Sequence, residues 1–227
     1  MARGILNEGA LPRLPEFIQA EIDWLPEGPT SIESRYDDAI AVPLILDRVR
    51  KAAQEGVDGV VINCFMDPGL QAARELVRIP VAGPAQSAML LAAGLGQTFS
   101  VILPASSGTP IVVDQATVYG VRERLASVRS VGMPVAELVQ ADRLVAGLLE
   151  QAGLAVSEDG AHSIILGCTG MSHVTERVKS EFAATGFGAP VLDPTLAAIG
   201  ALLGWRVLGV AHSEKAYESP EWRRPLS

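Results

Sequence analysis

Several residue types that usually mark an active site are scarce or absent in this chain of 227 residues. It has only two cysteines, Cys64 and Cys168, and three histidines that show no metal-ligand spacing with one another. A Gly-Lys-Ser/Thr phosphate loop and a G-x-S-x-G turn are both absent, and Gly94-Leu-Gly96 precedes a predicted strand instead of following one. Metal, phosphate-loop, dinucleotide and serine-hydrolase sites are therefore not indicated, and we expect no metal.

Positive charge and long apolar runs are also limited. Eighteen basic residues against 26 acidic ones give a formal net charge of −8, and no basic run is longer than Arg223-Arg224. A nucleic-acid partner is not expected without a clustered basic face. The apolar stretch 196–205 is too short to cross a bilayer, and no secretory leader is indicated before Glu8. We expect a cytoplasmic protein that binds a small-molecule substrate and no membrane; the sequence leaves a homo-oligomer open.

The composition that remains is typical of an α/β protein, with 48% hydrophobic residues, 22 Gly and 15 Pro. Each cysteine closes an apolar run that predicts a strand, 57–64 for Cys64 and 162–168 for Cys168. Ligands bind at the carboxyl ends of strands in such proteins. A helix N-terminus can lower a cysteine pKa from ~8.5 to ~7 or below, so a thiol in this position is suited to proton transfer.

The region around each cysteine is repeated along the chain. A polar helical stretch follows each cysteine, then comes Pro-Val-x-x-Pro at 80–84 and at 190–194, and then an Ala/Leu-rich helix. Short strands are predicted at 4–7 and 98–103, which would start the two halves. Each half therefore reads β-α-β-Cys-α-β-α.

This repeat predicts an α/β fold of two pseudo-symmetric lobes, each a mainly parallel sheet flanked by helices. Residues 1–97 with about 208–227 would form the first lobe, carrying Cys64, and residues 98–207 the second, carrying Cys168. Right-handed crossovers would place both cysteines at the carboxyl edges of their sheets. The active site would then lie in the cleft between the lobes.

Local signals add predictions within each half. Helical spacing of apolar residues predicts helices over 37–55 and 135–149, and the tail from Ala211 is polar. Asp67-Pro68 resembles an N-cap with proline at the first helical position, and Ser172 is a plausible cap after Cys168.

Two matched thiols suit a reaction in which one group removes a proton from a carbon beside a carbonyl and the other returns one from the opposite face. Backbone N–H groups after each cysteine could stabilise the enolate oxygen, with glycines allowing close approach. A single free cysteine is more often a small buried hydrophobe, but the matched positions favour function here. His173 could orient Cys168, although an ordinary helix-surface role fits it better.

The two cysteine blocks resemble those of a known family. Segment 63–70 (Asn-Cys-Phe-Met-Asp-Pro-Gly-Leu), with Arg74-Glu75 downstream, is similar to the first block of hydantoin and allantoin racemases, within the Asp/Glu/hydantoin racemase superfamily. Segment 165–171 (Ile-Leu-Gly-Cys-Thr-Gly-Met) resembles the second block. Segments 28–34 and 79–83 also look similar, so the likeness runs from about residue 28 to 204.

This resemblance implies a cofactor-independent racemase, an isomerase in which Cys64 and Cys168 are the acid/base pair. Asn7, Phe65, Thr169 and Gly170 would help hold the substrate. Phenylalanine after the first cysteine separates the hydantoin branch from glutamate racemases, so a 5-substituted hydantoin or allantoin is the favoured substrate.

Two segments depart from the family pattern. Residues 7–10 read Asn-Glu-Gly-Ala where Asn-Pro-Asn-Thr is usual, and 103–106 read Leu-Pro-Ala-Ser where Thr-Thr usually begins the loop. Both would line the pocket, and Glu8 could disfavour a dicarboxylate. The alternatives are an Asp/Glu-type amino-acid racemase, a maleate isomerase, an arylmalonate decarboxylase-like enzyme and a non-catalytic ligand-binding relative.

Overall fold

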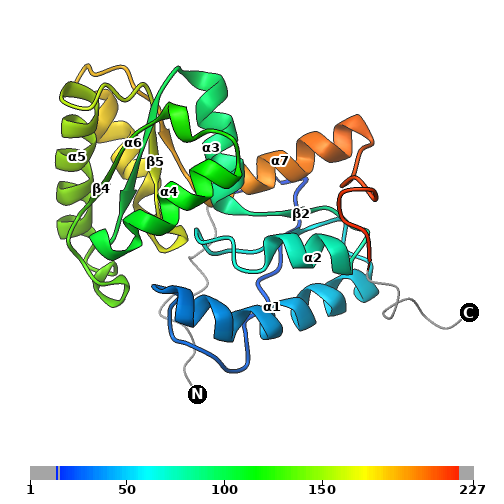
Figure 1. Ribbon diagram of the computed structural model, residues 1–227. Coiled ribbons are helices and arrows are strands. Elements are labelled where there is room, and N and C mark those ends of the chain that lie inside the picture. Colours follow the sequence, from blue (N-terminus) through cyan, green and yellow to red (C-terminus); the bar gives the residue numbers. More distant parts are fainter. Residues whose placement is uncertain (1–13, 15, 220–227) are drawn as a thin grey trace, which may run out of the picture.

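The protein is described by a computed structural model, which places residue 14 and residues 16–219 (Figure 1). Thirteen helices and strands alternate along this part of the chain: α1 (Arg35–Glu55), β1 (Val60–Val61), α2 (Leu70–Leu76), β2 (Val81–Ala82), α3 (Pro84–Leu95), β3 (Phe99–Leu103), α4 (Thr109–Val118), β4 (Leu125–Ser130), α5 (Ala141–Ser157), β5 (Ile164–Leu166), α6 (Thr175–Ala183), β6 (Val191–Leu192) and α7 (Pro194–Leu208). Short 3-10 helices at Ser106–Gly108, Arg122–Arg124, Val135–Glu137 and Thr169–Val174 join some of them.

The second half of the chain forms a four-stranded sheet in the order β4-β3-β5-β6, with all neighbours parallel. Side chains alternate between its two faces. Ile102, Ile164 and Leu166 pack with α5 and α6 on one face, whereas Phe99, Val101 and Ile165 pack with α3 and α4 on the other. Because both faces are covered by helices, β3 is buried along its whole length.

The first half forms a smaller sheet, in which β1 and β2 pair in parallel. Helices α1 and α2 pack together beside it through a core that includes Ala41, Ile45, Leu70 and Ala73. Figure 1 shows this smaller lobe on the right and the four-stranded lobe on the left.

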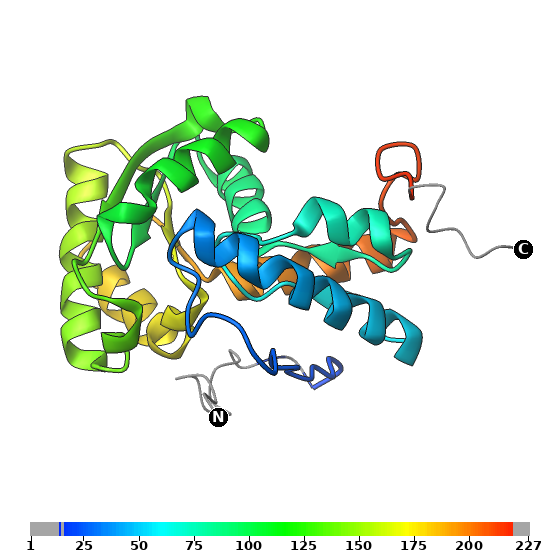
Figure 2. The same ribbon diagram turned by 60° about the horizontal axis from the view of Figure 1, so that its bottom comes forward.

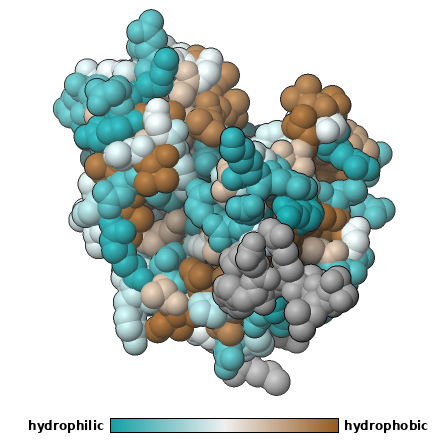
Figure 3. Space-filling model, turned by 45° about the vertical axis from the view of Figure 1, so that its right-hand side comes forward, coloured by the Kyte–Doolittle hydropathy of each residue, from teal (hydrophilic) through white to brown (hydrophobic). Residues whose placement is uncertain are grey.

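Helices α3 and α7 join the two lobes. α3 follows β2 of the first sheet but contacts β3 and β5 of the second, and α7 follows β6 of the second sheet but contacts β1 and β2 of the first. The two helices also pack against each other. Their outer faces are apolar, with Leu90, Leu91 and Leu95 of α3 and Val207 and Leu208 of α7 exposed. Figure 3 shows hydrophobic surface at the top of one side of the molecule, on either side of a hollow.

The α/β fold with parallel sheets and flanking helices is confirmed, as are the predicted strand at 98–103 and the helix over 37–55. The repeat is less regular than predicted, because the second half contains an additional strand and helix, β4 and α5, before β5. The predicted helix over 135–149 starts later, at Ala141, and runs to Ser157. The strand predicted at 4–7 lies outside the described residues, and the division into lobes at residues 97 and 207 remains a prediction.

Both predicted helix caps are wrong. α2 begins at Leu70 after Gly69, whose left-handed backbone (φ 67°) suits glycine, and the Asp67 carboxylate instead accepts hydrogen bonds from the first turn of α3. α6 begins after Val174, and the Ser172 hydroxyl is buried without a hydrogen-bond partner among the residues that the structure describes. Within residues 14 and 16–219, the structure contains no helix with the length and apolar character needed to span a membrane.

Candidate active site

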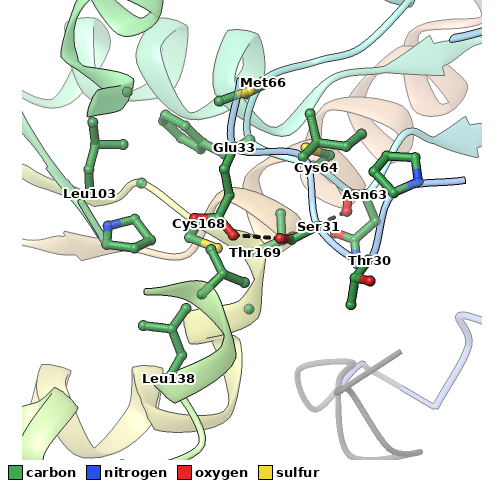
Figure 4. Close-up of a pocket in the computed structure, with 18 of the residues that line it drawn as sticks. Thr30, Ser31, Glu33, Asn63, Cys64, Met66, Leu103, Leu138, Cys168 and Thr169 are labelled. Carbon is green, nitrogen blue, oxygen red and sulfur yellow. Dashed lines mark hydrogen bonds between the residues drawn. The ribbon is translucent and has the colours of Figure 1, made fainter. Parts of the chain in front are cut away.

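A cavity of about 770 Å³ lies between the two lobes, at the carboxyl ends of β1, β3 and β5 (Figure 4). The segment before α1 closes one side of it, and Figure 2 shows this segment passing between the lobes before α1 starts. The lining residues come from the four segments 24–33, 63–66, 103–115 and 167–173 and from the 3-10 turn near Leu138. Both cysteines are in this wall, so the cavity brings together residues 104 positions apart in sequence (168 and 64).

Cys64 lies in the turn that follows β1. This turn closes through a hydrogen bond from the Asp67 N–H to the Cys64 carbonyl (3.0 Å). Side chains of the second half hold it on both sides of the cysteine: Thr169 Oγ1 donates to the Asn63 carbonyl (3.1 Å), and Gln115 Nε2 donates to the Phe65 carbonyl (3.0 Å). The position of the Cys64 turn therefore depends on the neighbouring lobe.

Cys168 follows β5 and is the N-cap of the 3-10 helix Thr169–Val174. Its carbonyl accepts from the Met171 N–H (3.0 Å). Gly167, just before it, packs so closely on β3 that a Cβ would lie 2.7 Å from Leu103 Cδ2 and 2.9 Å from the Ile102 carbonyl oxygen. A side chain at position 167 would therefore push the cysteine loop away from the sheet.

The pKa of neither thiol is lowered, which corrects the sequence prediction. Burial raises the pKa of Cys64 to about 12, and the nearby Cys168 and Asp67 add to this, while a hydrogen bond from the Met66 N–H acts in the opposite direction. Burial also raises the pKa of Cys168 to about 11, with a contribution from Glu33 and a lowering by the Gly170 N–H. The thiols are partly exposed to the cavity, but the surrounding protein solvates a thiolate poorly, and one backbone N–H per sulfur does not compensate.

The structure places three of the four predicted substrate-binding residues at this cavity. Phe65 is buried beneath it, and Thr169 bridges to the Cys64 turn. Gly170 lies beside the Cys168 sulfur, because a Cβ at residue 170 would be 3.4 Å from Cys168 Sγ. Asn7 lies outside the described residues. His173 lines the cavity as an exposed side chain whose Nδ1 lies 3.0 Å from the Gly170 carbonyl.

Other residues of the site were not identified from sequence, namely Ser31, Glu33, Asn63 and Gln115. Ser31 and Glu33 belong to segment 28–34, which the resemblance included without assigning a role. Asn63 is next to Cys64, and its Oδ1 accepts from Thr195 Oγ1 of α7 (2.8 Å). Gln115 lies inside an ordinary helix pattern, and no sequence signal distinguishes it.

The charge of the cavity wall is negative. Among the described residues that line it, the carboxylates are Glu27 and Glu33, and none is a lysine or an arginine. The described part of the chain contains no group of three or more His, Cys, Asp or Glu side chains able to hold a metal ion. The wall thus offers two thiols, backbone N–H groups and carboxylates to a ligand.

Known proteins are similar to this chain in sequence and in fold. Residues 5–202 match the family Asp/Glu/Hydantoin racemase. A hydantoin racemase of Rhizobium meliloti is 41% identical over 183 residues, covering 78% of this chain and 73% of that protein. A hydantoin racemase of Pseudomonas sp. (strain NS671) is 36% identical over 196 residues, covering 86% and 77%.

Among solved structures, an allantoin racemase from Klebsiella pneumoniae superposes with a TM-score of 0.81 at 34% identity, over 89% of this chain and 81% of that one. The family resemblance seen in the two cysteine blocks is therefore confirmed over most of the chain. The chain belongs to the Asp/Glu/Hydantoin racemase family.

Proposed function

We propose that this protein is a racemase of a 5-substituted hydantoin or of allantoin, and that Cys64 and Cys168 transfer the proton. The observation that carries the proposal is that both thiols lie in the wall of one cavity between the lobes. Relatives of 36–41% identity named hydantoin racemase support the substrate class.

In the proposed reaction, the thiolate of one cysteine removes the proton from the ring carbon beside the carbonyl. The electron pair of the C–H bond moves to the carbonyl oxygen and forms an enolate. The thiol of the other cysteine then gives its proton to the opposite face of that carbon and is left as the thiolate. The roles are exchanged for the other enantiomer, so two chemically similar groups are needed.

The raised thiol pKa values fit a demanding proton abstraction. A thiolate in a poorly solvated cavity is a stronger base than one in water, because the protein stabilises its charge less. The backbone N–H groups of Met66 and Gly170 already point at the sulfurs. The cost is that few molecules carry a thiolate at neutral pH, so the rate should rise with pH through the alkaline range.

A neutral ring suits this cavity better than an amino acid with two carboxylates. A dicarboxylate would bring negative charge to a wall that has carboxylates and, in its described part, no lysine or arginine. The cavity also includes the apolar side chains of Leu103, Val112 and Leu138, which can contact a 5-substituent.

The thiol pair supplies both proton-transfer groups, so the proposal requires no cofactor. Enzyme dialysed against EDTA is expected to keep its full rate, and a requirement for added metal would contradict the proposal. Two working thiols need a reducing compartment, and we propose the cytoplasm.

The test uses single enantiomers of a 5-substituted hydantoin and of allantoin in D₂O, with optical rotation and deuterium uptake followed together. Cys64→Ser and Cys168→Ser are each expected to lose racemisation, at least about 10³-fold, since each removes one proton-transfer partner. Each single variant retains one thiol and should exchange deuterium only with the enantiomer that this thiol faces. The double variant should do neither. Racemisation at the wild-type rate in either single variant would refute the two-thiol assignment.

A further inference from the structure

Glu33 lies at the end of the segment that closes the cavity, one residue before the N-cap of α1. Its backbone is fixed by the first turn of that helix. The Glu33 N–H donates to Asp37 Oδ2 (3.2 Å), the Ser34 hydroxyl donates to the same oxygen (2.7 Å), and the Asp37 N–H donates to Ser34 Oγ (3.2 Å). This reciprocal capping holds residue 33 at the cavity wall.

The Glu33 side chain extends into the cavity toward Cys168 (Figure 4). Ser31 Oγ donates a hydrogen bond to Oε1 at 2.5 Å. Within the described part of the chain, this carboxylate forms no other hydrogen bond and no ion pair. A carboxylate can accept about four hydrogen bonds, so most of its accepting capacity is open to a ligand.

The charge of Glu33 also affects the Cys168 thiol. The Glu33 carboxylate lies beside Cys168 in Figure 4, and its charge contributes to the raised pKa of that thiol. Glu27 offers a comparison, because it lines the same cavity from the same segment but is exposed to solvent. Its charge is therefore screened far more than that of the half-buried Glu33.

We propose that Glu33 determines substrate specificity: its carboxylate accepts a hydrogen bond from a ring N–H of a neutral ureide and repels ligands that carry a carboxylate near the reacting carbon. This inference rests on the proposed function, since it assigns the substrate class to a residue of the same site. A ureide ring supplies N–H donors and has no negative charge, so it meets both requirements. An amino dicarboxylate leaves its carboxylates unpaired against Glu33.

The test measures binding separately from turnover. 5,5-Dimethylhydantoin has the ring N–H groups but no hydrogen at C5, so it can bind without being racemised. 5-Methylhydantoin-5-acetic acid adds a carboxylate to the same ring and likewise has no hydrogen at C5. Dissociation constants of both compounds are measured by calorimetry for the wild type, Glu33→Gln and Glu27→Gln.

For Glu33→Gln, we expect the dimethyl compound to bind about 10-fold more weakly, because a charge-assisted hydrogen bond becomes a neutral one. The acetic acid compound should bind more tightly, so that the ratio of the two dissociation constants changes by more than about 10-fold. Glu27→Gln should leave this ratio within about 2-fold of the wild type, because its charge is screened. Equal ratios in all three proteins would overturn the role of Glu33.

A kinetic measurement gives a second, independent readout. Removing the Glu33 charge should shift the alkaline rise of kcat/KM to lower pH, whereas Glu27→Gln should leave it in place. If the wild type racemises hydantoins but Glu33→Gln changes neither the ratio nor the pH profile, the inference fails and the proposed function stands. If the wild type neither binds nor racemises them, both fail.

Discussion

The two halves of the molecule place a buried carboxylate at the same point but take it from different parts of the chain. In the second half, Asp193 caps α7 by accepting from the Leu196 N–H (3.0 Å), and it accepts from Thr175 Oγ1 (2.8 Å). In the first half, the equivalent position before the helix is Gly83. The carboxylate that caps α3 there belongs to Asp67, in the Cys64 turn, which accepts from the Ala85 and Gln86 N–H groups (2.9 and 2.8 Å).

The carboxylates also differ in what else they join. Thr175, the partner of Asp193, begins α6 of the same half. The further partner of Asp67 is the Tyr119 hydroxyl (2.7 Å), which follows α4 of the other half. Asp67 therefore joins the Cys64 turn, the first helix that crosses between lobes, and the second lobe. In both halves a carboxylate therefore lies before the last helix, but Asp193 supplies it from the position next to that helix and Asp67 supplies it from the cysteine turn.

This comparison predicts that Asp67→Ala is the more damaging of two equivalent substitutions. It leaves two backbone N–H groups and a tyrosine hydroxyl without their acceptor, and we expect the free energy of unfolding to fall by about 3–4 kcal/mol. Asp193→Ala removes one N–H acceptor and one hydroxyl acceptor, for about 2 kcal/mol. Urea unfolding followed by circular dichroism measures both. Equal losses in the two variants would mean that the link from Asp67 to Tyr119 adds nothing.

Gly83→Ala tests whether the Asp67 carboxylate fills the space that a side chain occupies in the other half. A Cβ at residue 83 would lie 2.5 Å from Asp67 Cγ, so we expect a loss of about 2–3 kcal/mol from overpacking. Gly94→Ala is the matched control, because no atom of the described residues outside its own helix backbone and chain neighbours lies within 4 Å of its Cβ position. This change within α3 should stabilise the protein by about 0.5–1 kcal/mol.

A double-mutant cycle tests whether residue 83 is crowded by Asp67, and it does not depend on the size of either single loss of stability. In the Asp67→Ala background the carboxylate is gone, so Gly83→Ala should cost less than about 1 kcal/mol. Additive effects of the two substitutions would show that the crowding at residue 83 arises elsewhere.

The two cysteine turns differ in the same way, since only the Cys64 turn depends on a side chain of α4. Gln115→Leu removes the donor to the Phe65 carbonyl, and we expect the Cys64 turn to shift and kcat to fall about 10-fold with a smaller change in KM. Thr117→Val on the same helix is the control, because in the described part of the chain the Thr117 hydroxyl bonds only the Val113 carbonyl within α4. Its kcat should stay within about 2-fold of the wild type. An unchanged kcat in Gln115→Leu would show that the turn holds its position without this bond.

The sequence predicted the parts of this architecture that rest on local patterns. The apolar runs ending at Cys64 and Cys168 predicted strand ends, and the spacing over 37–55 predicted α1. The carboxylate arrangement could not be predicted, because the contact of Asp67 with α3 and Tyr119 depends on how distant segments pack. Local rules favoured Asp67 as a cap for the helix beside it.

The raised pKa values of the cysteines also could not be predicted from the sequence. A cysteine after a strand and before a helix is usually expected to have a lowered pKa. That expectation omits the depth of the cavity, which is set by segment 24–33 closing over a site more than thirty residues away along the chain. The specificity assigned to Glu33 depends on the same closure, so neither could be predicted from the motif alone.

The smallest expected effect concerns the pH dependence of stability, in which the buried Asp67 and the half-buried His212 oppose each other. Burial raises the pKa of Asp67 to about 6, so the folded state binds a proton more readily than the unfolded state, and this stabilisation is lost as the pH rises through about 6. Burial, with a contribution from Arg74, lowers the pKa of His212 to about 4. His212 therefore contributes stability that is present above pH ~6.5 and is lost as the pH falls through about 4.

Between about pH 4 and 6 the two slopes have opposite signs and partly cancel. His212→Asn should make the free energy of unfolding fall more steeply with rising pH than in the wild type, because only the Asp67 contribution remains. Asp67→Asn should make it fall more steeply with decreasing pH. Urea unfolding at several pH values within this window gives the slope of the unfolding free energy against pH for each protein. This slope is not affected by any loss of stability that is the same at every pH. If both variants shift the slope in the same direction, the opposite contributions of Asp67 and His212 to the pH dependence are refuted.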